Sequence, residues 1–249
     1  MALSDNLISY YSLDEASGDA IDAHSTNDLT ETSGTIASAS GKVGNCRDFE
    51  VGDTEYFTIA DNTDFSTGDI TFSMFAWVNA EDGGFYPGII GKDNFPTARE
   101  YRLYLHTNSL TPRLGVSSDG VNLDGIVAWG SNLSTATWYF IAAGHSASAN
   151  EIWISVDGGT PVTSAHSIGV ADTTCAFNIG GEAGFEWDGL IDEVAFFKRD
   201  IRSDLASFYN SGNGLSYADI VGGAFTWQQL DSGLYIPPAF RSPCKVVAY

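Results

Sequence analysis

The chain has 249 residues, of which 43% are hydrophobic, enough for one large all-β domain or two small domains. Its 32 acidic and 11 basic residues give a formal net charge of −21, which repels phosphate backbones and anionic membrane surfaces. We therefore expect no nucleic-acid partner and no membrane insertion, whereas an acidic surface offers many oxygen ligands to calcium.

The N-terminus and the cysteines narrow the class further. Residues 1–5 (MALSD) do not begin a basic region followed by a long apolar run, and no stretch approaches the length of a membrane span. Three cysteines, none in a C-x-x-C pair, argue against zinc or thioredoxin-like sites and against a disulfide scaffold, although one bridge stays open. These features predict a soluble protein made without an ordinary export signal.

Short apolar runs separated by turn residues predict strands along most of the chain. In the run 70–78, Phe72 and Met74 fall on one face while Phe75 and Trp77 fall on the other, which predicts a central strand covered on both sides. The predicted strands are 7–13, 29–36, 43–49, 56–59, 70–78, 88–91, 101–105, 113–116, 123–129, 138–143, 151–156, 176–179 and 185–197.

The strand 185–197 carries two acids inside an apolar run. Asp192 and Glu193 occupy adjacent positions, so regular alternation predicts that they point to opposite faces. A buried carboxylate without a partner is costly, so each acid needs a cation, backbone donors or a metal. The partners of these two acids are therefore a functional question.

One short helix follows that strand. Ser203 is the predicted N-cap, Asp204 favours the first turn, and Leu205 with Phe208 gives an apolar face. Residues 217–249 contain scattered aromatics and prolines without a clear period, which predicts an arm or an extra edge strand beyond a domain of residues 1–216. About a dozen short strands and one helix predict an all-β, antiparallel sandwich.

The order of these segments resembles the laminin-G-like branch of the concanavalin A-like jelly rolls. The matching segments are 7–18 (LISYYSLDEASG), 21–28 (IDAHSTND), 41–49 (GKVGNCRDF), 55–59 (EYFTI), 72–78 (FSMFAWV), 187–194 (WDGLIDEV) and 209–212 (YNSG). The segment 187–194 is the most specific, and the resemblance covers about residues 5–215. It implies an antiparallel concanavalin A-like jelly-roll sandwich with one short helix.

The resemblance also implies a calcium site, because several members of the family bind calcium near the first and last strands. It assigns Asp22 and Asn27 from the early loop and Asp192 from the closing strand as ligands. Oxygen ligands of this kind suit calcium. The alternative is that Asp22 caps a turn and Asp192 accepts backbone N–H bonds.

An enzyme is weakly supported. Retaining glycoside hydrolases need two carboxyls across a cleft, and related glucanases carry Glu-x-Asp-x-x-Glu on one strand. Glu186 and Asp188 begin this pattern, but Ile191 stands where the second Glu belongs. Four scattered histidines form no catalytic motif, so we expect a protein that is not an enzyme.

Binding of a sugar is the stronger interpretation. Sugar sites combine aromatic platforms with Asp, Asn and Arg for hydroxyls. The predicted ligand-binding residues are Tyr86, Phe95, Arg99 and Trp129, all near expected loops. For each aromatic residue, the alternative is packing between the two sheets.

These patterns predict a non-enzymatic, lectin-like adhesion module that binds a glycan or cell-surface ligand, with calcium as its cofactor. A second hypothesis is a structural virion protein, such as a capsid decoration or fibre, that meets its assembly partner through the C-terminal arm. The expected location is therefore a virion surface or the extracellular space.

Overall fold

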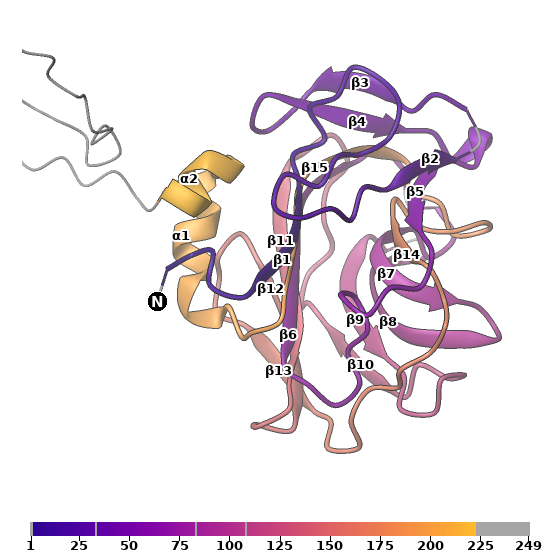
Figure 1. Ribbon diagram of the computed structural model, residues 1–249, viewed down its shortest axis with the longest axis vertical. Coiled ribbons are helices and arrows are strands. Elements are labelled where there is room, and N and C mark those ends of the chain that lie inside the picture. The colour runs from indigo at the N-terminus through magenta and orange to yellow at the C-terminus, as the bar shows by residue number, and fades with distance from the viewer. Residues whose placement is uncertain (1, 33, 83, 108, 223–249) are drawn as a thin grey trace, which may run out of the picture.

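A computed structural model describes residues 2–32, 34–82, 84–107 and 109–222. Two antiparallel sheets face each other (Figure 1). The larger sheet contains β1 (Leu7–Tyr11), β3 (Ala37–Ser40), β4 (Asn45–Phe49), β6 (Phe72–Ala80), β11 (Tyr139–Ser146), β12 (Glu151–Val156), β13 (Val162–Ala165) and β15 (Gly189–Phe197). The smaller sheet contains β2 (Thr30–Thr32), β5 (Tyr56–Ile59), β7 (Gly88–Asn94), β8 (Ala98–His106), β9 (Thr111–Val116), β10 (Gly125–Ala128) and β14 (Phe177–Ile179).

The strand order confirms an antiparallel sandwich of the predicted class. The larger sheet runs β13-β12-β11-β6-β15-β4-β3, with β1 also paired to β15, and the smaller sheet runs β10-β9-β8-β7-β14-β5-β2. Strands β3 and β13 were not predicted from the sequence, because their residues, ASAS and VTSA, contain little apolar alternation.

Strand β6 has the two-sided burial that its sequence predicts. Phe72 and Met74 belong to the core between the sheets, whereas Phe75 and Trp77 belong to a second buried cluster on the outer face of the larger sheet. The strand lies between β11 and β15, so its backbone groups are paired on both edges. Between the sheets, the rings of Phe65 and Phe177 stack at a centroid distance of 3.9 Å.

The chain covers the outer face of the larger sheet with its last described helices, α1 (Leu205–Tyr209) and α2 (Tyr217–Gly222). The 3-10 turn η2 (Arg202–Asp204) precedes α1, and η3 (Asn210–Gly212) lies between the two helices. Figure 1 shows both helices on the side of this sheet that faces away from the smaller sheet. Phe208 and Ile220 are each 1% exposed in the outer cluster.

Two expectations about this region need revision. Ser203 is not the N-cap: it lies within η2, and Asp204 stands at the cap position without a side-chain cap hydrogen bond. The packed body extends to residue 222 rather than ending at 216, because α2 buries Ile220 against the sheet. Residues 223–249 of the predicted arm lie outside the described residues, so its assembly partner and a virion location stay predictions.

A β-bulge in β15 changes the expected geometry of the two acids. Ile191 and Val194 both belong to the core between the sheets, so two residues, rather than the one of a regular strand, separate these inward positions. The register with β6 shifts between Asp192 and Ala195, and Glu193 takes a φ of 49°. The bulge therefore places both Asp192 and Glu193 between two core-facing residues, and the prediction of opposite faces is wrong.

Burial dominates the electrostatics of these acids. Asp192 accepts backbone N–H bonds from Lys42 at 2.7 Å and Val43 at 2.9 Å, while burial raises its pKa to about 7. Glu193 is 1% exposed, and burial followed by the charge of Asp219 raises its pKa to about 9. Oε2 of Glu193 has no hydrogen-bond partner among the described residues.

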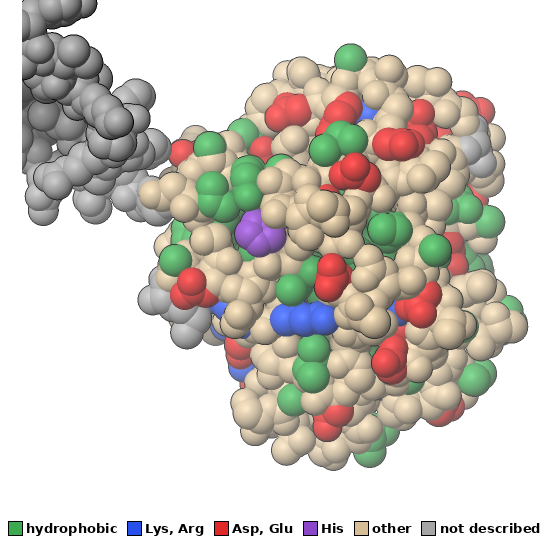
Figure 2. All heavy atoms as spheres, in the orientation of Figure 1, with side chains coloured by type: hydrophobic (Ala, Val, Ile, Leu, Met, Phe, Trp, Pro, Cys, Tyr) green, Lys and Arg blue, Asp and Glu red, His purple; other side chains and the backbone are tan. Residues whose placement is uncertain are grey.

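The surface is rich in acidic side chains, as the composition predicts. In Figure 2, acidic side chains are spread over the visible face rather than gathered in one patch. Cys46 and Cys175 are buried free thiols, so they do not bridge each other. No helix within the described ranges is long and apolar enough to cross a membrane.

Candidate functional site

The candidate site lies on the outer face of the smaller sheet. Along β8, Tyr101, Leu103 and Leu105 point into the core between the sheets, so the alternate residues Arg102 and Tyr104 point outward. Both outward side chains line a pocket of about 410 Å³. This volume falls in the range of small-molecule sites, roughly 300–1,000 Å³.

Loops from four parts of the chain complete this pocket, which we call the aromatic pocket. Phe85 and Tyr86 precede β7, Phe95 lies in the β7–β8 turn, and Phe185 lies between β14 and β15. The remaining lining residues come from β8, β10 and the loop between β9 and β10; they are Arg99, Arg102, Tyr104, Asn122, Leu123 and Ile126. The pocket is therefore built from residues that lie far apart in the sequence.

The rings of the pocket contact one another and still present surface to solvent. Phe85 and Phe185 stack at 5.8 Å between centroids, and Phe95 meets the edge of Phe185 at 5.9 Å. Phe85 and Phe95 are nevertheless 63% and 54% exposed. Exposed aromatic rings around a concavity are a feature of ligand sites, since water leaves their faces when a ligand stacks on them.

Two arginines hold the polar side of the pocket in place. Arg99 donates two hydrogen bonds to Asp93, Nε to Oδ1 at 2.6 Å and Nη2 to Oδ2 at 2.9 Å. Arg102 lies 3.7 Å from the same carboxylate, donates to the carbonyl of Tyr86 and stacks on the ring of Phe185 at 4.4 Å. Burial lowers the pKa of Arg102.

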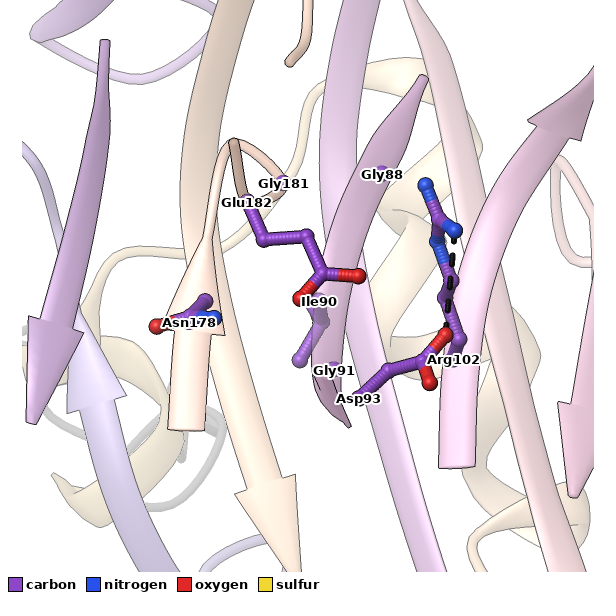
Figure 3. A pocket seen from close by; sticks show the side chains of 8 residues that line it. All are labelled: Gly88, Ile90, Gly91, Asp93, Arg102, Asn178, Gly181 and Glu182. Atoms are coloured by element: carbon purple, nitrogen blue, oxygen red, sulfur yellow. Dashed lines mark ion pairs between the residues drawn. The ribbon is translucent and has the colours of Figure 1, made fainter. Parts of the chain in front are cut away.

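A smaller polar hollow adjoins the aromatic pocket and shares Arg102 with it. Figure 3 shows this hollow, which we call the polar trough; its lining is Gly88, Ile90, Gly91, Asp93, Arg102, Asn178, Gly181 and Glu182. Burial, followed by the charge of Asp93, raises the pKa of Glu182 to about 7, and its Oε1 has no hydrogen-bond partner among the described residues. The Thr58 hydroxyl donates to Oδ1 of Asn178 at 2.6 Å.

Two glycines position the loop that carries Phe185 and Glu182. Gly180 and Gly181 have φ values of 85° and 98°, a region that residues with a Cβ avoid. This turn brings Phe185 back to β7, where the N–H of Gly88 donates to the carbonyl of Phe185 at 2.9 Å. A side chain at Gly181 would also collide with the backbone of Phe185.

The structure brings together three of the four predicted ligand-binding residues. Tyr86, Phe95 and Arg99 all line the aromatic pocket. Trp129 does not: it follows β10, packs against the core between the sheets, and lies 3.4 Å from where a Cβ of Gly159 would stand. Trp129 therefore packs against the core, which is the alternative stated above for each aromatic residue.

The three predicted calcium ligands have separate nitrogen donors. Oδ1 of Asp22 accepts from the N–H groups of Tyr10 and His24, both at 3.0 Å. Oδ1 of Asn27 accepts from the Asn62 side chain at 2.7 Å, and Asp192 is held by backbone of the 42–43 loop. Among the described residues no group of three His, Cys, Asp or Glu side chains gathers as metal ligands. Calcium, with Asp22, Asn27 and Asp192 as its ligands, stays a prediction.

The carboxyls considered for hydrolysis have structural partners. Glu186 accepts from the N–H of Gly184 at 2.7 Å, and Asp188 accepts from the N–H of Val51 at 3.3 Å. Neither residue lines the aromatic pocket or the polar trough.

Sequence reasoning missed several residues that build the site. Arg102 and Tyr104 could have been found from their alternation with the apolar residues of strand 101–105. Phe185 was assigned to a strand that begins only at Gly189, although the Gly180-Gly181 pair signals a turn before it. The contribution of Asn178 carried no sequence signal, since its position depends on the pairing of β14 with β5 and β7.

Comparison with known proteins places this geometry in a family. A laminin-G model described as the Concanavalin A-like lectin/glucanases superfamily matches residues 51–204, more than half of the chain. A comparison with curated proteins returned no match. The binding domain of Paraclostridial Mosquitocidal Protein 1 superposes with a TM-score of 0.67 at 12% identity, over 94% of this chain and 64% of that one.

Two further structures share the fold. Domain 4 of AbnA, a GH43 extracellular arabinanase from Geobacillus stearothermophilus solved with arabinotriose, has a TM-score of 0.60 and 17% identity over 84% of this chain and 98% of that one. Botulinum neurotoxin type C, in a structure describing its interaction with two ganglioside molecules, has a TM-score of 0.61 and 12% identity over 84% of this chain and 52% of that one. The chain thus belongs to the Concanavalin A-like lectin/glucanases superfamily.

Proposed function

We propose that this protein is a non-enzymatic binding module that recognises a glycan through the aromatic pocket on the smaller sheet. The observation that carries the proposal is that the exposed rings of Phe85 and Phe95 line one concavity together with the guanidinium groups of Arg99 and Arg102. Sugars present apolar C–H faces and hydroxyl edges, so a site for them needs aromatic surface and polar groups side by side.

The pocket is prepared for binding before a ligand arrives. The guanidinium of Arg99 is fixed by two hydrogen bonds to Asp93, and the guanidinium of Arg102 is held between Tyr86 and Phe185. Groups that are already ordered lose little conformational entropy when a ligand binds. The fixed arginine side chains therefore favour ligand binding even though the pocket offers few polar contacts.

The structural relatives support the class of ligand but do not carry the argument, because identities of 12–17% show the fold alone. One relative was solved in complex with arabinotriose, and the cell entry of another depends on interaction with two ganglioside molecules. Both kinds of molecule are carbohydrates or carry them, which makes a glycan the first ligand to test for this chain.

The test is a glycan array probed with the purified protein, with calcium and with a chelator, beside the variants Phe85→Ala and Phe95→Ala. We expect both variants to lose binding at an unchanged melting temperature, since the two rings are largely exposed. The matched control is Ile168→Ala, which removes a side chain that is 66% exposed and does not line the pocket.

The outcomes separate the alternatives. Binding by the pocket variants at the level of the control would place the site elsewhere on the molecule. No binding to any glycan would refute the proposed function. Bound oligosaccharide is expected to be recovered at its original length after prolonged incubation, and shortened products would favour a hydrolase instead.

A further inference from the structure

We propose that the polar trough receives a single uncharged hydroxyl group of a sugar stacked in the aromatic pocket, so that the module selects neutral glycans over acidic ones. This inference rests on the proposed function and names the ligand class of the same site. Three features of the site carry this inference. The protein already bonds the edge of Arg99 that would bind a carboxylate, the hollow is small, and a hydrogen-bond acceptor faces a donor across it.

The protein occupies one edge of Arg99 with two hydrogen bonds and one N–H group of Arg102. A carboxylate is recognised best by the two parallel N–H groups at one edge of a guanidinium. Arg99 presents its Nε and Nη2 edge to Asp93, at 2.6 and 2.9 Å. Arg102 donates Nη2 to the carbonyl of Tyr86 and turns Nη1 toward Asp93 at 3.7 Å. An acidic sugar would have to displace Asp93 from Arg99 to gain the same pair of bonds, whereas the other N–H groups of Arg102 suit a single hydroxyl.

The trough also contains acids that repel an anion. Asp93 and Glu182 line it together with Arg102, and Figure 3 shows the carboxyl of Glu182 over Ile90, between Asn178 and Arg102. Arg99 and Arg102 carry two positive charges against the two carboxyls, so the group offers no net attraction to an ionic ligand when Glu182 is ionised. The chain as a whole, at a net charge of −21, adds to the repulsion of anions.

The size of the trough limits the group that enters it. Its volume is about 10 Å³, close to the smallest hollow that holds one water molecule, about 10–15 Å³. Three of its eight lining residues are glycines, Gly88, Gly91 and Gly181, which leave this space open. A hydroxyl oxygen fits such a volume, whereas both oxygens of a carboxylate do not.

The polar groups suit a hydroxyl in particular. A hydroxyl donates one hydrogen bond and accepts others. Glu182 supplies an Oε1 acceptor that has no partner among the described residues, and the Arg102 guanidinium supplies donors on the other side. A site that pairs its buried polar groups with a ligand hydroxyl discriminates strongly, because those groups stay unpaired with any other ligand.

The experiment compares trisaccharides of glucose, galactose and mannose with their uronic acid counterparts, which exchange a hydroxymethyl group for a carboxylate on the same carbon. An array of neutral, uronic, sialylated and sulfated glycans first identifies which class of ligand the protein binds. We expect neutral ligands to bind at least about tenfold more tightly than acidic ones. Acidic glycans as the stronger binders would overturn this inference and leave the proposed function standing, whereas no binding to either class would refute both.

Two variants assign the preference to the trough. Glu182→Gln keeps the size of the side chain and removes its charge, so the preference for neutral ligands should narrow to within about threefold. Phe95→Ala is the matched control: it should weaken neutral and acidic ligands by the same factor and keep their ratio. A ratio that Glu182→Gln leaves unchanged would show that the trough does not set the selectivity.

A third variant tests the size limit. Gly91→Ala places a methyl group in the trough, 3.1 Å from the carbonyl oxygen of Tyr101 and 3.6 Å from Cγ of Arg102, at a backbone conformation that alanine adopts. It should weaken neutral ligands by about tenfold while the protein melts as a folded domain. Neutral binding that persists in this variant would contradict entry of a hydroxyl into the trough.

Discussion

The two outer faces of the sandwich carry similar aromatic side chains but meet different surroundings. On the larger sheet, α1 and α2 cover the outer face, and its rings form a second buried cluster. On the smaller sheet, Phe85 and Phe95 stay more than half exposed around a pocket. The same type of residue therefore adds stability on one face and offers a binding surface on the other.

The acids differ between the two faces in the same way. On the covered face, Glu193 is buried and forms no ion pair with a described residue, and its raised pKa keeps it protonated at neutral pH. On the open face, Asp93 is bonded to Arg99 and lies near Arg102. Covering a face with chain thus excludes water and counter-charges together, whereas an open face allows charged groups to be paired and to meet a ligand.

The largest expected effect is on the covered face. Phe208→Ala removes a ring that is 1% exposed and packs against Phe75 at 5.0 Å and Phe197 at 5.6 Å. We expect the free energy of unfolding to fall by about 3–5 kcal/mol, measured by urea denaturation. A loss below about 1 kcal/mol would mean that the helices do not form a core on this sheet.

The second largest effect is expected at Asp93 and concerns both the stability of the fold and the ligand site. Asp93→Ala removes the partner of Arg99 and an anion 3.7 Å from Arg102, which leaves Glu182 as the remaining carboxyl beside two mostly buried cations. We expect a destabilisation of about 3 kcal/mol, at the low end of the range for broken buried ion pairs, together with loss of glycan binding. Asp93→Asn is the control that keeps the shape, and it should recover part of the stability because it still accepts hydrogen bonds.

A smaller effect, of opposite sign, is expected for Glu193→Gln. The folded-state pKa of Glu193 is raised from 4.5 to about 9, so the folded state holds a proton that the unfolded chain releases. The stability that this group gives is complete below about pH 4.5 and is lost as the pH rises toward 9. The variant should therefore be more stable than the parent at pH 8 and equal to it near pH 4.

The measurement for this variant is urea denaturation between pH 4 and 9. Some dependence on pH will remain in the variant, because burial also raises the pKa of Asp192 and Glu182 to about 7. A difference between variant and parent that does not grow with pH would contradict a protonated Glu193 in the folded protein.

The smallest effect on stability is expected on the open face. Phe95→Ala removes a ring that is 54% exposed, so unfolding should change by less than about 0.5 kcal/mol. Its affinity for glycan should nevertheless fall about tenfold or more, measured by calorimetry. Equal losses of stability and binding would remove the distinction between the two faces.

Much of the fold could be predicted because its signals are local. Apolar alternation in 70–78 predicted the two covered faces of β6, and the turn residues separated most of the other strands. Tyr86, Phe95 and Arg99 were predicted as ligand contacts from their chemistry, and they line one pocket. Trp129 has the same chemistry and packs inward, since local chemistry does not say which side of a loop a ring will face.

Other features depended on residues that are distant in sequence. The bulge at Glu193 depends on how β15 aligns with β6, and regular alternation could not reveal it. Phe185 and Glu182 reach the site only because the turn at Gly180 and Gly181 folds their loop back onto β7.

The sequence by itself determined that this chain forms a two-sheet sandwich of a known family, because alternation and turn chemistry are properties of neighbouring residues. Only the tertiary structure decided which outer face is open. That outcome depends on where α1 and α2 pack and on four separate loops meeting over β8, and no local pattern carries this information. Burial, set by the whole fold, then decided which acids keep their charge.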